Sequence, residues 1–183
     1  MLYFSRKPLN LINIGRSLVL AVLFNSAIVS AQSNDYKVEV IVFERLHSDA
    51  LSESHHYEAP FEMKHEANYW RLSPSLLVEE AELLNDSSQY SVQRHYAWGV
   101  ESLPYEQSAN YTVIEPDSQG YIKVYADHLL FTNIDLDYKG YRMHEKRRLK
   151  LNEKHYFDHP KFGLLMQVSR IAHPETSASE QGQ

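Results

Sequence analysis

Alternating apolar and polar residues predict most of the strands in this chain. In residues 36–44, YKVEVIVFE, Val38, Val40 and Val42 share one fully apolar face, and the opposite face is partly apolar. A strand that is apolar on both faces is typical of the middle of a sheet, so this segment is predicted to be a central strand. The same reasoning predicts strands over residues 90–98 and 121–137, the second a long one, and a last strand over residues 163–171.

One amphipathic helix is predicted between the first two long strands. Ser73 and Pro74 fit the N-cap and the first helical position, and apolar residues recur at helical spacing up to Leu84. A strand–helix–strand start followed by further strands favours a single α+β domain over residues 35–172. Its expected architecture is an antiparallel sheet with the helix packed on one face.

Turn residues divide the rest of the chain. Lys139-Gly140 predicts a hairpin after the long strand, and Asp158-His159-Pro160 predicts the turn before the last strand. Residues 99–119 are polar and turn-rich, which predicts a loop with one short edge strand over residues 111–114. Residues 46–71 have clusters of Ser, Glu and His without a sustained period, and we expect a long surface segment, partly disordered.

The two ends of the chain are expected to lie outside the fold. Residues 1–31 have the pattern of a secretory signal peptide, with basic residues, an apolar run over residues 17–29 and the small-residue site Val29-Ser30-Ala31. The apolar run is short for a membrane span, so we expect cleavage after Ala31 and no stable membrane span afterwards. An uncleaved N-terminal anchor is the alternative. Residues 173–183 are polar and predict a disordered tail.

Charge is distributed unevenly along the chain. The whole sequence has 18 basic and 24 acidic residues and a formal net charge of -6. Most of the acidic residues precede residue 139, whereas basic residues predominate over residues 139–170. An exported protein with this overall acidity is not expected to bind nucleic acid, because the phosphate backbone would repel it.

Several kinds of catalytic or metal site find no support. The absence of cysteine excludes disulfides, thiolate metal sites, a cysteine nucleophile and a lipid anchor on an N-terminal cysteine. His155 and His159 have the spacing that a helix would use to hold zinc, but Pro160 argues against a helix there. There is no G-x-S-x-G nucleophile motif, and the six glycines do not group into a phosphate loop. No metal and no cofactor is therefore predicted.

The basic segment offers the best candidate ligand residues. Arg142, Arg147, Arg148 and Lys150 can present several fixed cations, and arginine binds carboxylate or phosphate groups through two parallel hydrogen bonds. Tyr156 can add an aromatic contact. These five residues are the predicted ligand-binding set. The alternative is that the cations form ordinary ion pairs with acidic residues on neighbouring strands.

Two stretches resemble the CsiV family of periplasmic peptidoglycan-binding proteins, named for cell shape integrity. Residues 36–45, YKVEVIVFER, resemble the opening strand of that family, and residues 145–148 and 153–165, EKRR and EKHYFDHPKFGLL, resemble its closing pattern. The resemblance implies a periplasmic protein that binds peptidoglycan without turnover. It also implies support for wall synthesis by a class A penicillin-binding protein through the lipoprotein activator of that enzyme.

Two other functions remain open at this point. One is a wall-modifying hydrolase that uses Glu or Asp, for which pairs such as Glu79-Glu80 are available. The other is a protein–protein adaptor whose basic segment docks on an acidic partner without holding the wall.

Overall fold

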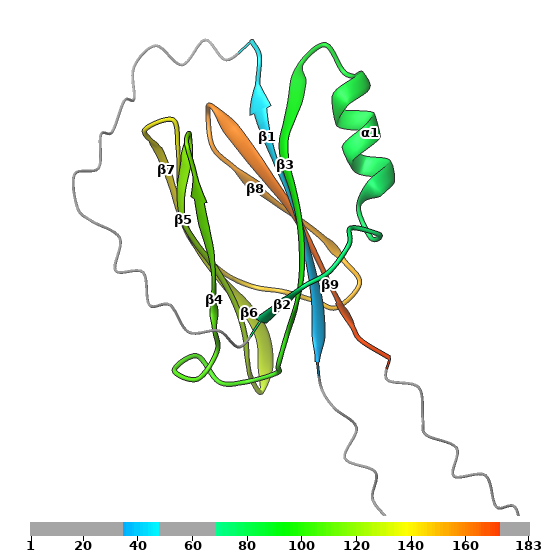
Figure 1. Ribbon diagram of the computed structural model, residues 1–183, viewed down its shortest axis with the longest axis vertical. Coiled ribbons are helices and arrows are strands. Elements are labelled where there is room, and N and C mark those ends of the chain that lie inside the picture. Colours follow the sequence, from blue (N-terminus) through cyan, green and yellow to red (C-terminus); the bar gives the residue numbers. More distant parts are fainter. Residues whose placement is uncertain (1–34, 48–68, 173–183) are drawn as a thin grey trace, which may run out of the picture. The chain divides into compact units, whose positions relative to one another are not determined.

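The computed structural model describes residues 35–47 and 69–172, which form two antiparallel sheets and one helix, α1 (Val78–Asp86). Figure 1 shows the two sheets, with α1 beside sheet A on the side away from sheet B. Sheet A has the order β2 (Tyr69–Arg71), β3 (Tyr90–Val100), β1 (Tyr36–Arg45), β9 (Phe162–Arg170), β8 (Lys154–Asp158). Sheet B has the order β4 (Asn110–Glu115), β5 (Ser118–Asp127), β6 (Leu129–Tyr138), β7 (Tyr141–Arg148).

The predicted fold class is only partly confirmed. The described part of the chain is mostly β, and the predicted α+β class fits it loosely, because a single short helix packs on one face of one sheet. The prediction of one antiparallel sheet is wrong, since two sheets pack face to face around the main core. Alternation along a strand identifies its buried face but does not say which other face covers it.

Strand β1 lies in the middle of sheet A, as its two apolar faces predict. It pairs with β3 on one side and with β9 on the other. Its valines, among them Val38 and Val40, are buried against sheet B, while Ile41 and Phe43 are buried on the opposite face under α1. Both faces of this strand are therefore buried from solvent, which explains its nearly continuous apolar sequence.

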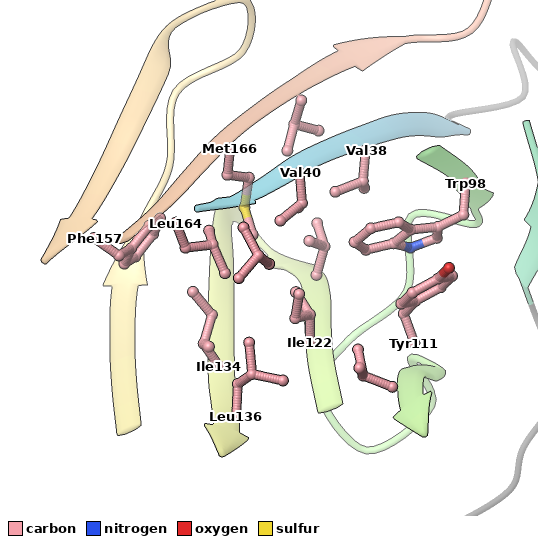
Figure 2. Packing of buried hydrophobic residues seen from close by; sticks show 14 of the residues in the cluster. Val38, Val40, Trp98, Tyr111, Ile122, Ile134, Leu136, Phe157, Leu164 and Met166 are labelled. Carbon is pink, nitrogen blue, oxygen red and sulfur yellow. The ribbon is translucent and has the colours of Figure 1, made fainter. Parts of the chain in front are cut away.

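The main core fills the space between the two sheets. Figure 2 shows side chains of sheet A pointing at those of sheet B, with Trp98 against Tyr111. The rings of Trp98 and Tyr111 stack with centroids 4.1 Å apart, which joins β3 to β4. The side chains labelled in the core are Val38, Val40, Trp98, Tyr111, Ile122, Ile134, Leu136, Phe157, Leu164 and Met166.

Helix α1 starts later than the sequence predicts. Its N-cap is Leu77, with no side-chain cap, so the expected start at Ser73-Pro74 is wrong. Instead, the buried carboxylate of Glu39 on β1 accepts hydrogen bonds from the backbone N–H groups of Ser75, Leu76 and Leu77, at 2.8, 2.8 and 2.9 Å. A side chain of the sheet thus satisfies the amides that a local cap would otherwise satisfy.

The predicted long strand over residues 121–137 is two strands, β5 and β6, joined by a tight hairpin. Asp127 pairs with Leu129, and only His128 lies between them, with a φ of 58°. Among residues other than glycine, histidine is one of those that adopt this left-handed conformation more readily. The sequence has no glycine or proline at this position to mark the turn. The prediction failed because the alternation continues unbroken through such a short turn.

The other predicted elements agree with the structure where it describes them, except that Tyr69–Arg71, at the end of the expected surface segment 46–71, forms strand β2. Strand β4 is the edge strand expected within residues 99–119, and the Lys139-Gly140 turn has positive φ at both residues, as a tight hairpin requires. The turn at Asp158-His159-Pro160 leads into β9. The predicted signal peptide, the tail over residues 173–183 and most of the 46–71 segment lie outside the described residues. Within the described ranges, no helix is long and apolar enough to cross a membrane.

Candidate functional site

Strand β7 carries most of the predicted basic ligand residues and is tied to sheet A at both ends. At its start, the Lys139 ammonium group donates a hydrogen bond of 2.9 Å to the Glu44 carboxylate on β1, and this contact raises the pKa of Lys139. Near its end, the guanidinium group of Arg147 donates to the carbonyl oxygen of Tyr156 on β8, at 2.8 Å. These contacts fix the edge of sheet B relative to sheet A.

The alternation of β7 sends its basic residues to two different faces. Odd-numbered residues point toward the core: Met143 is buried, and the guanidinium carbon of Arg147 lies 4.5 Å from the centre of the Phe157 ring. Even-numbered residues lie on the outer face of sheet B; they are Arg142, His144, Lys146 and Arg148. The predicted basic ligand residues of β7 therefore do not all lie on one face of the sheet.

Arg142 is held in an ion pair. Its Nε and Nη2 atoms each lie 2.5 Å from an oxygen of the Asp135 carboxylate on β6, and both side chains are largely covered. This is the bidentate geometry that arginine forms with carboxylates. The alternative of ordinary ion pairing therefore describes Arg142 in this structure.

Arg148 and Lys150 are the more available cations of the predicted set. Arg148 is exposed, and its side chain forms no hydrogen bond or ion pair within the described ranges. Lys150 follows in the loop between β7 and β8, where its ammonium group lies 3.2 Å from the Glu153 carboxylate, with both groups well exposed. An exposed pair of this kind contributes little and exchanges readily for another anion.

Tyr156 lies on the outer face of sheet A, the same sheet face that α1 covers. Its hydroxyl donates to the Asp158 carboxylate and accepts from Arg45, both at 2.6 Å, and its ring stacks on Phe43. Burial, followed by the hydrogen bond to Asp158, raises the pKa of Tyr156. Tyr156 and Arg148 are thus on different sheets and on faces that point away from each other, so the structure does not bring them into one site.

The structure also reveals a cluster that sequence reasoning missed. Aromatic rings from β5, β6 and the preceding loop gather on the outer face of sheet B, beside the outward cations of β7. We call this cluster the aromatic patch, and its members are Tyr105, Lys123, Tyr125, Phe131, Asn133 and Lys146. The alternation of Tyr121, Lys123 and Tyr125 is a visible signal in the sequence, but the unrecognised β5–β6 hairpin hid its closeness to Phe131.

Packing within the aromatic patch is well defined. The ring of Tyr105 meets the ring of Tyr125 edge to face at 5.0 Å, and Tyr125 stacks on Phe131 at 5.6 Å. The Lys146 ammonium group lies 5.6 Å from the centre of the Tyr105 ring, and that of Lys123 lies 4.4 Å from it. The patch therefore combines apolar ring surface with two positive charges.

Residues 139–171 match the family model described as CsiV, peptidoglycan-binding protein. The match confirms the resemblance found in the closing part of the sequence, and it spans β7, β8 and β9, including all five predicted ligand residues. It covers less than a fifth of the chain. It supports a peptidoglycan-binding protein as the coarse description of function. No curated protein and no solved structure matches the chain.

Metal-binding side chains do not cluster in the part of the chain that the structure describes. No group of three or more His, Asp or Glu residues there is placed to hold an ion. His155, one of the two histidines with zinc-like spacing, instead uses Nε2 to accept the backbone N–H of Lys150 at 3.1 Å. That histidine therefore shapes the β7–β8 loop.

Proposed function

We propose that this protein is a non-catalytic periplasmic peptidoglycan-binding protein, and that it contacts the wall through the outer face of β7 and the loop that follows. The observation that carries the proposal is the place of Arg148. It lies in the segment that matches the peptidoglycan-binding family, it is exposed, and no carboxylate neutralises it within the described ranges. Peptidoglycan supplies suitable anions, namely the carboxylates of its peptide stems.

The five predicted ligand residues take different parts in this proposal. Arg148 and Lys150 make direct contact with wall carboxylates, since both are exposed. Arg142 and Arg147 chiefly hold β7 in place through Asp135 and the Tyr156 carbonyl group. Tyr156 would belong to a second contact on sheet A, together with Arg45.

The proposal also includes a partner. By its resemblance to the family, the protein would support a class A penicillin-binding protein through the lipoprotein activator of that enzyme. Wall binding on the face of sheet B would leave α1, on the far side of sheet A, available to such a partner.

Co-sedimentation with purified sacculi tests the wall contact. Arg148→Glu should reduce the fraction of protein that sediments, and raising the salt concentration should reduce retention of the wild type, because the contact is electrostatic. Arg71→Glu is the matched control, since it makes the same charge change on the exposed edge strand β2. Equal retention of Arg148→Glu and Arg71→Glu would remove β7 from the proposed contact.

The same preparation separates the proposed function from its rivals. A hydrolase would release soluble wall fragments from sacculi during incubation, whereas a non-catalytic binder would release none. A pure adaptor would bind the isolated lipoprotein activator but would not sediment with sacculi at any salt concentration.

A further inference from the structure

Strand register places residues of the aromatic patch and the outward residue Arg148 of β7 in two neighbouring rows. Across β5, β6 and β7, the first row is Tyr125, Phe131 and Arg148, and the row next to it is Lys123, Asn133 and Lys146. Residues paired in this way on one face of a sheet have Cβ atoms about 5 Å apart. The two rows therefore bring aromatic rings, an amide and cations within about the span of one sugar ring.

The exposed ring of the patch belongs to Tyr105. Tyr105 is 36% exposed as a whole residue, whereas Tyr125 beneath it is 4% exposed. Tyr105 lies in the turn that precedes β4, and it covers the middle of the face from outside the sheet. An aromatic ring displayed in this way offers its face to the apolar C–H surface of a pyranose, and its hydroxyl stays available for a hydrogen bond.

Asn133 is the feature that points to a ligand. It is 7% exposed, and its Nδ2 lies 3.4 Å from the Tyr105 hydroxyl and 3.3 Å from the Tyr121 hydroxyl. Its Oδ1 is buried and has no hydrogen-bond partner. A buried acceptor left without a donor is unfavourable, and such groups are rare in folded proteins. A ligand N–H or O–H placed beside the Tyr105 ring would satisfy this oxygen.

We propose that the aromatic patch is a saccharide subsite that takes one N-acetylated hexosamine ring of a glycan strand. This inference rests on the proposed function and names the part of the wall that is recognised. The sugar ring stacks on Tyr105, its amide or hydroxyl hydrogen reaches Oδ1 of Asn133, and Lys146 and Arg148 meet a carboxylate carried by the neighbouring lactyl or peptide group. Tyr105 and Asn133 thus contact the sugar ring, while Lys146 and Arg148 bind the carboxylate beside it.

Two probes separate these contributions. The first is NMR titration of the folded protein with an uncharged tetramer of N-acetylglucosamine. The second is co-sedimentation with sacculi. Replacing the ring by Tyr105→Leu should weaken binding of the tetramer about tenfold, since loss of the stacking contact removes the main apolar surface. Tyr105→Phe, which keeps the ring, should bind within about threefold of the wild type. Arg71→Glu, on the exposed edge strand β2, should change neither readout, whereas Arg148→Glu should reduce retention on sacculi.

The outcomes distinguish the subsite from the wider function. If the wild type sediments with sacculi but does not bind the tetramer, or if Tyr105→Leu binds it as well as the wild type does, the subsite is refuted and the proposed function stands. If the wild type neither sediments nor binds the tetramer, both are refuted. Melting curves for each variant verify that it is folded, and the Tyr105→Phe variant guards against a fold defect in Tyr105→Leu.

Discussion

The buried carboxylate of Glu39 should be one of the largest single contributors to the stability of this fold. It is inaccessible to solvent on β1, and its two oxygens share four hydrogen-bond partners. Oε2 accepts from the backbone N–H groups of Ser75 and Leu76, and Oε1 accepts from Leu77 and lies 2.8 Å from Nε2 of His95. We therefore expect Glu39→Gln to destabilise the protein even though it preserves the size of the side chain.

The magnitude follows from the geometry. A glutamine keeps one oxygen and replaces the other by an NH₂ group, which faces one or two backbone N–H donors instead of accepting from them. The remaining hydrogen bonds also lose their charged acceptor, and each such bond is worth about 1.5–3 kcal/mol, so the free energy of unfolding should fall by about 3 kcal/mol or more. For a domain of this size the melting temperature should fall by about 10 °C.

Stability should also depend on pH through this group. Burial alone would raise the pKa of Glu39, but the three backbone amides and His95 together lower it below its ordinary value of 4.5. Because the folded-state pKa is the lower one, the stabilisation is present above pH 4.5 and is lost as the pH falls below that value. The wild type should lose this part of its stability in acid, and Glu39→Gln should show a shallower dependence.

Urea denaturation followed by circular dichroism measures both effects. Glu101→Gln serves as the control, because it removes the same charge from an exposed position and should change stability by no more than about 0.5 kcal/mol. A Glu39→Gln variant within about 1 kcal/mol of the wild type would refute the reasoning, as would identical acid profiles for the two proteins.

Two further substitutions test contacts near the proposed site. Arg142→Ala should cost about 3–5 kcal/mol by leaving Asp135 unpaired, and adding Asp135→Asn should recover part of that loss, whereas additive effects in urea denaturation would argue against the pair. Gly120 has a φ of 140°, and an added Cβ would lie 2.1 Å from the carbonyl oxygen of Asp135, so Gly120→Ala should strongly destabilise sheet B. Gly163→Ala should cost less, because its Cβ would meet the side chain of Phe43, and equal melting temperatures for the two variants would contradict this ranking.

Much of the fold could be predicted from local patterns because burial in this protein follows strand alternation. The two faces of β1 could be read from Val38 and Ile41, and the hairpin at Lys139-Gly140 from its glycine. The start of α1 could not, since Ser73 offers a good local cap while the actual partner, Glu39, is more than 30 residues away in sequence. Tertiary contacts of this kind override local helix signals.

The candidate site was only partly predictable for a related reason. The excess of positive charge after residue 139 could be counted, but the partner of Arg142 could not be identified without the register of β6 against β7. The aromatic patch depends on the hairpin at His128, which brings Tyr125 beside Phe131. A strand pattern shows which residues share a face, and only the topology shows which strands share it.

The contact from Arg147 to the Tyr156 carbonyl group has a practical consequence for genetics. Residues 139–171 contain β7, which belongs to sheet B, and β8 and β9, which belong to sheet A. This stretch therefore connects the two sheets and also carries the exposed cations. A screen for loss of wall binding would collect many substitutions in this stretch that act by lowering protein abundance. Variants of Arg148, whose side chain forms no hydrogen bond or ion pair within the described ranges, should be the ones that lose binding at a normal protein level.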